Sequence, residues 1–374
     1  MSREQTMICR FSAFFFLIAF VLAPTANAMQ PESVADEFRP LVPRQMLPLL
    51  HTPEIHQELK LSKAQVVDLE SFFGEIDGAW FQARILPADK QNPILNSLDE
   101  RVHKWLSDHA TKEQRERLSQ IELQAQSVRM LLREDLAESL KLESSQQDRF
   151  AELARSTVAA QAALQKALNQ GEPSDELQKK ANAAVQAEQD DVRKILKADQ
   201  QKHLAQLLGE PFELSNLNRI YPMAPEFVPV SNWVNSQPLK LKDLRGKVVL
   251  VHFYAFQCHN CHANFEIYRR WHEQLRKKGV EVIGIQTPET SQERDPAAVK
   301  SAAVSRKLEF PILVDLESKN WGAWGNTMWP TVYVVDKNGY IRHWWQGELN
   351  WKGATADKTI ENVVQKLLDE RVGS

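Results

Sequence analysis

The sequence predicts a two-part chain in which an all-α part is followed by an α/β domain. Two observations separate the parts near residue 210. Only Trp80 and Trp105 of the ten tryptophans precede this point, whereas glycine and β-branched residues are concentrated after it. The first part is rich in Ala, Gln, Glu, Leu, Lys and Arg, which favour helices. A third observation, the alternation of expected strands and helices after residue 225, is typical of an α/β sheet.

The first 28 residues have the layout of a secretory signal peptide. Arg3 and Arg10 precede an apolar run, Phe11–Ala23, and Ala26-Asn27-Ala28 follows as a cleavage site. We therefore expect residues 1–28 to be removed and the protein to be exported, to the periplasm or another extracytoplasmic compartment. The alternative is an uncleaved membrane tether, although the run is shorter than the roughly 20 residues that span a bilayer. After cleavage, no membrane span is expected.

The charge pattern argues against a nucleic-acid partner, and the spacing of the histidines argues against a metal site. The net charge of the 374 residues is −3 and is spread along the chain, so nucleic acid is not expected as a partner. Histidines such as His51 and His103 share no ligand spacing with a cysteine or carboxylate, so no metal site is expected. The sequence predicts no cofactor, and it leaves the oligomeric state open.

Residues 29–210 are expected to form an all-helical domain with an internal repeat. Four short blocks in it share a polar starter, a Gln and then apolar residues at helical spacing, which is a helix-start signal. The blocks are residues 59–65, 111–115, 140–146 and 197–201. The first and third resemble each other, as do the second and fourth, so we interpret the domain as two copies of a helical hairpin pair.

One of these blocks carries a resemblance of its own. Ser62-Lys63-Ala64-Gln65 resembles the LTxxQ motif of Spy/CpxP-like periplasmic helical proteins, although the copies at residues 142–146 and 197–200 depart from it. The resemblance implies binding of unfolded chains or sensing of envelope stress. A helical module that binds partner chains is therefore an alternative function.

The α/β part follows a linker, residues 211–224, that is bounded by prolines. Its expected strands and helices fill residues 225–374. The strands are residues 247–254, 280–285, 331–335 and 340–345, and the helices are residues 262–278, a segment that opens at Asp295-Pro296, and residues 356–370. Asn338-Gly339 predicts a tight hairpin turn between the last two strands.

Cys258 and Cys261 are the residues most directly tied to chemistry. The third cysteine of the chain, Cys9, lies in the expected signal peptide. The pair stands where a buried strand turns into a helix, and a helix start favours thiolate over thiol. A disulfide that closes so small a loop stabilises a fold little, so we expect a redox-active Cys258–Cys261 pair that exchanges with protein thiols and disulfides. His259 lies between the cysteines, and we expect His259→Ala to lower the reduction potential.

The order of these parts resembles the thioredoxin superfamily. A strand, a C-x-x-C at a helix start and a βαβ connection precede Trp329-Pro330-Thr331 and the final hairpin. Over about residues 225–350 the sequence is similar to the thioredoxin-like domain of the TlpA/DipZ-like group, for example in residues 244–251 and 282–289. The resemblance implies a thioredoxin fold and thiol–disulfide oxidoreductase activity.

The resemblance also implies roles for individual residues. Cys258 corresponds to the exposed nucleophile and Cys261 to the buried resolving cysteine. Pro330, beside Trp329, corresponds to the cis-proline that holds the partner's backbone near the sulfur. His252 departs from the pattern, because thioredoxin has a buried Asp there that helps move a proton from the resolving thiol. We interpret His252 as a buried histidine with a hydrogen-bond partner, which leaves that proton acceptor open.

Three other kinds of site are considered for the cysteine motif. Cys258-His259-Asn260-Cys261-His262 matches the C-x-x-C-H attachment motif of c-type haem, but it follows a buried strand that haem would have to open. A peroxiredoxin, which shares the fold, needs Thr where this chain has Ala255. A zinc site needs about four ligands, and the motif offers too few.

The sequence leaves the direction and the clients of the exchange open. A reductant, an oxidant and an isomerase can all use this motif, and an electron-donor redox protein is an expected second partner. Tyr254, Phe256 and Trp329 are expected to line an apolar surface near Cys258 on which a protein chain docks.

Overall fold

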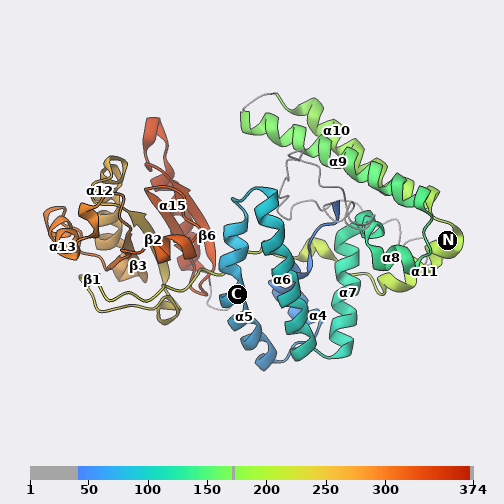
Figure 1. Cartoon of the computed structure of the whole chain (residues 1–374), viewed down its shortest axis with the longest axis horizontal. Coiled ribbons are helices and arrows are strands. Elements are labelled where there is room, and N and C mark those ends of the chain that lie inside the picture. The colour runs from blue at the N-terminus through green and yellow to red at the C-terminus, as the bar shows by residue number, and fades with distance from the viewer. Residues whose placement is uncertain (1–40, 171–172, 371–374) are drawn as a thin grey trace. The chain divides into compact units, whose positions relative to one another are not determined.

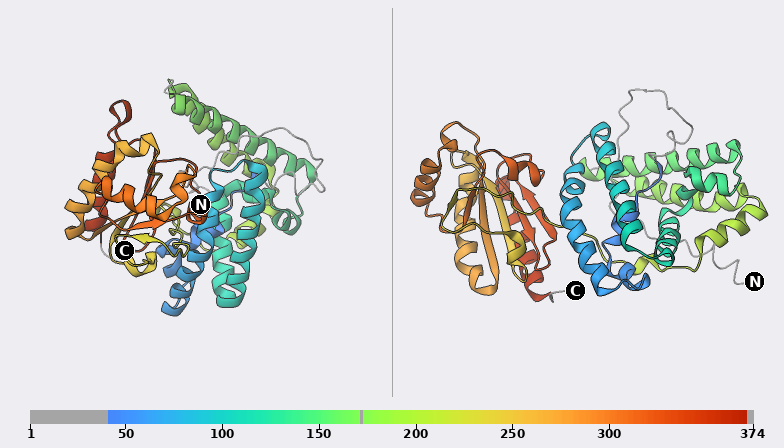
Figure 2. Two further views of the ribbon diagram at one scale, coloured as in Figure 1. Left: turned by 60° about the vertical axis from the view of Figure 1, so that its left-hand side comes forward. Right: turned by 60° about the horizontal axis from the view of Figure 1, so that its bottom comes forward.

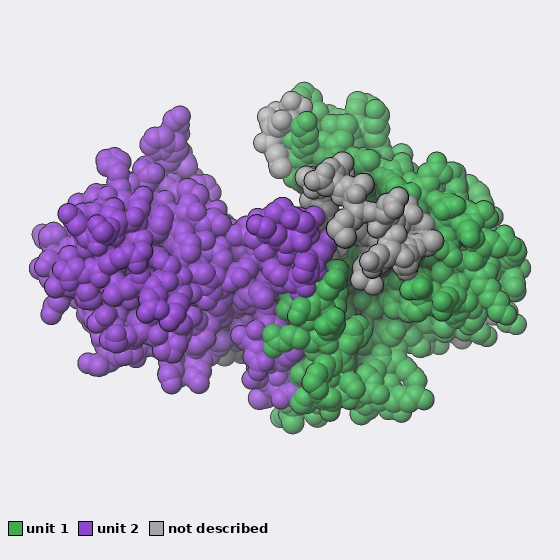
Figure 3. All heavy atoms as spheres, viewed as in Figure 1, with its two compact units in different colours: residues 1–66, 96–220 green, residues 67–95, 221–374 purple. Residues whose placement is uncertain are grey.

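The computed structural model describes residues 41–170 and 173–370 (Figure 1). The expected signal peptide, residues 1–28, lies outside the described residues. Within them, no helix is both long and apolar enough to cross a membrane. The chain divides into two compact units, coloured separately in Figure 3. Unit 1 comprises residues up to 66 together with residues 96–220, and unit 2 comprises residues 67–95 and 221–374.

Unit 1 is helical, as its composition predicts. Two of its helices, α5 and α6, extend into unit 2. Within the described residues the helices are α3 (Met46–Leu50), α4 (Pro53–Glu58), α5 (Lys63–Ala83), α6 (Ala88–His109), α7 (Lys112–Gln126), η3 (Ser127–Leu132), α8 (Glu134–Ser139), α9 (Ser144–Gln170), α10 (Asp175–Ile195) and α11 (Ala198–Leu208). The long helices α9 and α10 lie side by side as an antiparallel hairpin (Figures 1 and 2). Leu131, Phe150 and Ala151 are at the centre of one core of this unit.

The repeat expected from the sequence takes the form of two glutamine pairs. In the first pair, Gln65 Nε2 donates to Gln114 Oε1 at 2.9 Å and to the carbonyl of His109 at 2.8 Å. Gln114 Nε2 reaches back to the carbonyl of Leu59 at 3.2 Å. Each glutamine also accepts from the main-chain N–H of the residue that caps its own helix, Ser62 or Thr111.

The second pair repeats this arrangement about 80 residues later. Gln146 Nε2 donates to Gln200 Oε1 at 2.9 Å and to the carbonyl of Ile195 at 2.7 Å, and Gln200 Nε2 donates to the carbonyl of Leu140 at 3.3 Å. Gln146 and Gln200 are 6% and 5% exposed. Helices α5, α7, α9 and α11 begin at the four blocks, so the helix starts expected there are confirmed.

Unit 2 is built on a six-stranded mixed sheet. Its strands are β1 (Trp233–Val234), β2 (Val248–Tyr254), β3 (Val280–Gln286), β4 (Ile312–Val314), β5 (Thr331–Val335) and β6 (Ile341–Gln346), in the order β1-β4-β3-β2-β5-β6. Strands β2, β3 and β4 pair in parallel, whereas β5 pairs antiparallel with both β2 and β6. The expected α/β thioredoxin fold is confirmed.

Helices and single turns connect the strands. The α-helices of unit 2 are α12 (His259–Leu275), α13 (Pro296–Ser305), α14 (Lys319–Ala323) and α15 (Ala356–Asp369), and its 3-10 turns are η5 (Leu241–Leu244), η6 (Arg276–Lys278), η7 (Gln292–Arg294) and η8 (Trp351–Gly353). The 3-10 turn η4 (Leu214–Asn216) belongs to unit 1. Gly339 has a φ of 93° in the hairpin between β5 and β6, a conformation that glycine adopts without strain.

Both faces of the sheet are buried, which explains why every residue of β2 is buried and all but His252 are apolar or aromatic. Leu250 and Tyr254 point into a core shared with α12, α13 and α15. Val251 and Phe253 point into the opposite core, and Phe81 of α5 joins them there.

The two units differ from the expected domains, residues 29–210 and 225–374, in more than one segment. Residues 67–95 group with the sheet and not with the other helices. Residues 221–224, at the end of the expected linker, also join unit 2, because Met223 pairs with Tyr340 and Ala224 donates to the carbonyl of Gly339 at 2.9 Å. The amphipathic pattern of a helix shows that it buries one face, but it does not show against which core.

Candidate active site

Cys258 and Cys261 stand at the start of α12, directly after β2. Cys258 has an extended backbone and caps the helix, and the N–H of Cys261 donates to its carbonyl at 3.1 Å. The expected helix therefore begins three residues earlier than residue 262. Cys258 is half-buried and Cys261 is fully buried, and both are free thiols.

The pKa values of the two thiols are shifted in opposite directions. The pKa of Cys258 is lowered, chiefly because the Cys261 thiol donates a hydrogen bond to it, with further help from the N–H groups of Cys261 and Asn260. Partial burial and the carboxylate of Glu289 oppose this lowering of the Cys258 pKa without reversing it. Burial raises the pKa of Cys261. The accessible sulfur is thus the one that ionises first, which is what a nucleophile and its resolving partner require.

Pro330 lies at the same end of the sheet as the cysteines. The peptide bond between Trp329 and Pro330 is cis, as the resemblance implied. Thr331 pairs with Phe253, so the antiparallel register places Pro330 opposite Tyr254, the last residue of β2, where the cysteine turn begins. The ring of Trp329 lies 4.2 Å from that of Trp321, between ring centroids.

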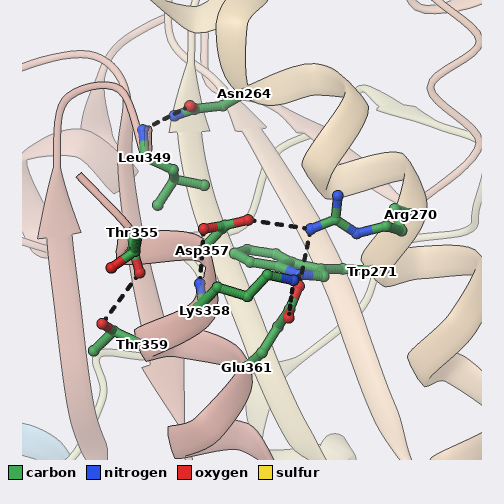
Figure 4. A network of polar contacts seen from close by, with 9 residues as sticks. All are labelled: Asn264, Arg270, Trp271, Leu349, Thr355, Asp357, Lys358, Thr359 and Glu361. Carbon is green, nitrogen blue, oxygen red and sulfur yellow. Dashed lines mark hydrogen bonds and ion pairs between the residues drawn. The ribbon is translucent and has the colours of Figure 1, made fainter. Parts of the chain in front are cut away.

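Asn264 connects the cysteine helix to the loop after β6. Its side chain donates to the carbonyl of Gly347 at 3.2 Å and accepts from the N–H of Leu349 at 2.9 Å (Figure 4). Gly347 in turn donates to the carbonyl of Pro330 at 2.7 Å. One buried asparagine, a single turn after Cys261, therefore ties α12 to the proline. Sequence reasoning missed it.

The far end of α12 is held against α15. Glu361 accepts from Arg270 and from the Trp271 indole, each at 2.9 Å, and from Lys358 at 2.8 Å (Figure 4). Partial burial acts to raise the pKa of Glu361, but these three donors lower it to about 2. The helix that carries both cysteines is thereby fixed at both of its ends.

Glu293 holds the turn that precedes Cys258. This carboxylate is fully buried, and one of its oxygens accepts from the N–H of Gln257 at 2.7 Å. The other oxygen accepts from the N–H groups of Glu289 and Thr290, at 2.7 and 2.9 Å. Sequence reasoning gave Glu293 no role beyond its place in the stretch that matches the TlpA/DipZ-like group.

His252 lies in the core without a hydrogen-bond partner, so the partner expected from sequence is absent there. Both ring nitrogens are buried and unpaired among the described residues. The ring stacks on Tyr268 with centroids 4.0 Å apart, and burial lowers its pKa to about 3. A Cβ on Gly284 would come within 3.2 Å of His252 Nε2, so glycine makes room for the ring. The histidine is neutral at ordinary pH.

Three aromatic residues were expected on the surface near Cys258, and the structure separates them. Tyr254 is 1% exposed and belongs to the core, so this expectation was wrong for Tyr254. Phe256 and Trp329 are partly buried at the edge of the same core as Cys258. Met328, which sequence reasoning did not select, is 42% exposed beside Trp329.

The two histidines of the motif, His259 and His262, have different surroundings. His259 is exposed, and no hydrogen bond within the described residues joins it to either cysteine. His262 places a ring nitrogen 2.7 Å from the carbonyl of Phe256. Over residues 41–170 and 173–370, no group of three or more His, Cys, Asp or Glu side chains is arranged to hold a metal.

Known proteins with similar sequences match unit 2. A family model described as the AhpC/TSA family matches residues 222–344. Protein DipZ of Mycobacterium tuberculosis is 33% identical over 150 residues, which are 39% of this chain and 21% of that protein. The thiol-disulfide oxidoreductase ResA of Bacillus anthracis is 30% identical over 118 residues and is covered over 64% of its length. This part of the chain has a thioredoxin-like fold, and its sequence is similar to thiol–disulfide oxidoreductases such as ResA.

Two further proteins match a similar share of this chain, about two fifths of its residues. The thiol-disulfide oxidoreductase YkuV of Bacillus subtilis is 25% identical over 146 residues, 94% of its length. The solved structure of a thiol-disulfide isomerase from Corynebacterium glutamicum is 26% identical, with a TM-score of 0.35, and covers 40% of this chain and 98% of its own. The chain spans about a fifth of the length of the DipZ proteins that it matches.

Proposed function

We propose that the protein exchanges disulfides with other proteins through Cys258 and Cys261. The observation that carries this proposal is the asymmetry of the pair. The accessible thiol at the helix start has a lowered pKa, and the second thiol is buried behind it. Pro330, beside Trp329, lies opposite Tyr254 at the end of β2, where the cysteine turn begins. We assign it to holding the partner's backbone.

The exchange proceeds in two steps with balanced bonds. The Cys258 thiolate attacks one sulfur of the partner's disulfide, a new S–S bond forms, and the partner's other sulfur leaves as a thiolate. Cys261 then loses its proton and attacks Cys258, which releases the partner as a dithiol and leaves the Cys258–Cys261 disulfide. A dithiol redox protein that donates two electrons restores the pair. In the opposite direction the same steps oxidise a partner.

We also propose that the protein works outside the cytoplasm. The signal-peptide pattern of residues 1–28 supports export, and a dithiol enzyme has disulfides to act on in an oxidising compartment. Cleavage can be checked directly, because the purified mature protein would begin at Met29. An N-terminus at Met1 in the membrane fraction would instead indicate a tether.

The attachment of haem is disfavoured by the burial of Cys261. A haem group held by C-x-x-C-H needs both sulfurs and the histidine at one open surface. Cys261 is 0% exposed, and the His262 ring is engaged with the carbonyl of Phe256. A Soret band after coexpression with haem-attachment machinery would contradict this interpretation.

The experiment that tests the proposed function is an equilibrium titration of the full chain in glutathione buffers, combined with an assay on a protein disulfide. We expect a two-electron transition that Cys258→Ser and Cys261→Ser both abolish. A potential near about −270 mV, that of thioredoxin, would indicate a reductant, and one near about −120 mV an oxidant. A chain that exchanges no protein disulfide in either direction would refute the proposal.

A further inference from the structure

Helix α5 supplies part of the core of the redox domain. Phe81 is 4% exposed and packs edge-on against Tyr333 of β5 and Trp344 of β6, with centroids 6.0 and 5.5 Å apart. The Arg84 guanidinium lies 3.3 Å from the centroid of the Phe81 ring. The sheet face opposite α12 is therefore closed by a helix that comes from the helical part of the sequence.

Main-chain contacts fix the position of α5. Asp77 is fully buried, and its carboxylate accepts from the N–H of Met223 at 2.7 Å. Gly78 lies beside Pro225, so that a Cβ there would be in ordinary contact with the proline ring at 3.5 Å. These contacts set the register of α5 along the domain, and they determine which residue reaches the neighbouring helix α14.

Gln82 is that residue. Its side-chain Nε2 donates to the carbonyl of Gly322 and, at 2.9 Å, to that of Ala323. These carbonyls belong to the last turn of α14, where helix carbonyls lack intrahelical partners. The carbonyl of Gly322 also accepts from the N–H of Gly325 at 3.0 Å, so the bond from Gln82 matters most at the carbonyl of Ala323. Gln82 thus caps a helix that lies about 240 residues away in the sequence.

Helix α14 leads directly to the proline of the site. Trp321, next to the two capped carbonyls, carries the ring that lies 4.2 Å from Trp329. Asn326 bridges the same stretch, because its side chain accepts from the Tyr333 hydroxyl at 3.0 Å and donates to the carbonyl of Met328 at 3.3 Å. A continuous series of contacts therefore runs from α5 to Trp329 and Pro330.

We propose that Gln82 is a positioning residue of the redox site. By capping α14 it holds Trp321 and Trp329 in place, and Trp329 is part of the surface on which a disulfide-bearing protein docks. The helical segment 67–95 is then a working part of the thioredoxin-like domain. This inference rests on the proposed function, since docking of a protein partner is the step that Gln82 supports.

The test replaces Gln82 in the full chain by methionine, which has similar volume but no N–H donor. The matched control is Gln124→Met. Gln124 Nε2 also donates to two carbonyls, those of Leu208 and Glu210, at 2.7 and 2.9 Å, but it lies in unit 1. For Gln82→Met we expect KM for a protein disulfide to rise about tenfold, as for loss of one hydrogen bond to a carbonyl, that of Ala323, that is left unpaired. The rate with glutathione disulfide and the potential of the cysteine pair should stay as in the wild type, and Gln124→Met should change none of these.

A second measurement does not depend on activity. Hydrogen exchange of the full chain should show that Gln82→Met speeds exchange of the main-chain N–H groups in residues 319–329 and leaves residues 259–275 unchanged. An unchanged exchange rate in residues 319–329, or a small-disulfide rate that falls together with the protein-disulfide rate, would overturn the proposal. Absence of exchange activity in the wild type would instead refute the proposed function, and the hydrogen-exchange result would still decide the role of Gln82.

Discussion

The main-chain N–H of Cys261 donates a 3.1 Å hydrogen bond to the carbonyl of Cys258. The first turn of α12 is thus closed between the two cysteines themselves. Cys258 stands at the positive end of the helix, and the thiol of Cys261 lies one turn inside, in the core. The different properties of the two sulfurs follow from this one turn.

The lowered pKa of Cys258 predicts a pH profile. Raising the pH through this pKa converts thiol to thiolate, so the rate of alkylation by iodoacetamide should rise and reach a plateau, with a midpoint below the usual value of about 8.5. Cys261→Ala removes the strongest lowering contact and should move the midpoint upward. A midpoint in the wild type at or above that of Cys261→Ala would contradict this explanation of the lowered pKa.

Loss of the Glu293 carboxylate should raise the pKa of Cys258. In Glu293→Gln an NH₂ group replaces one carboxylate oxygen. That oxygen accepts hydrogen bonds from main-chain N–H groups in the wild type, whereas an NH₂ group is itself a donor and cannot accept them. The turn before Cys258 then loosens, and the N–H groups that stabilise the thiolate are less well placed. The alkylation profile measures the change. Glu281→Gln on β3 is the control, because this carboxylate is 8% exposed and pairs with Lys247 instead. An unchanged or lower pKa in Glu293→Gln would count against the positioning role.

Burial of neutral His252 should make the protein sensitive to acid. The unfolded chain protonates this histidine near pH 6.5, whereas the folded chain does so only near pH 3. Above pH 6.5 the group has no effect, and as the pH falls from 6.5 towards 3 the unfolded state gains an advantage, about 2 kcal/mol at pH 5. His252→Phe keeps the stacking on Tyr268, so it should lose less stability than the wild type between pH 7 and pH 5. Urea unfolding at the two pH values measures this, and an equal loss in both proteins would show that His252 is not the cause.

The two glutamine pairs of the helical unit should differ in their contribution to stability. Gln146→Leu leaves the carbonyl of Ile195 without its donor, and Gln200 Oε1 keeps only the N–H of Lys197, in a buried site, which should cost about 1 to 3 kcal/mol. Gln65→Leu removes the matching bonds in the more exposed pair and should cost less, because water can replace them. Unfolding free energies of the two variants test this. A Gln65→Leu protein that is the less stable of the two would contradict the role assigned to burial.

The sequence predicted those parts of the fold that depend on local patterns. Strand β2 follows from its apolar run, and the hairpin after β5 follows from Asn338-Gly339. Helix α12 was expected from residue 262 because its first turn contains no apolar pattern; its true start depends on Cys258 acting as the cap. The four helix starts at Ser62, Thr111, Glu143 and Lys197 were visible as polar residues before a glutamine.

The remaining features depend on contacts between residues far apart in the sequence. Glu293, Asn264 and Gln82 are polar residues whose partners lie at least 35 residues away or belong to other elements, and no spacing rule selects them. The packing of Phe81 against Tyr333 could not be told from packing within a helical bundle. The effect of His259 on the potential stays a prediction, as does the chaperone role implied by the resemblance to Spy/CpxP-like proteins.

The most direct test of the central claim is to trap the mixed disulfide. Cys261→Ser keeps the nucleophile and removes the resolving thiol, so after reaction with a protein disulfide it should accumulate a covalent complex linked through Cys258, detected by intact mass and peptide mapping. Cys258→Ser should accumulate none, because Cys261 is buried and its pKa is raised. A complex that forms equally through Cys261, or the absence of any complex with Cys261→Ser, would contradict the assignment of Cys258 as the nucleophile.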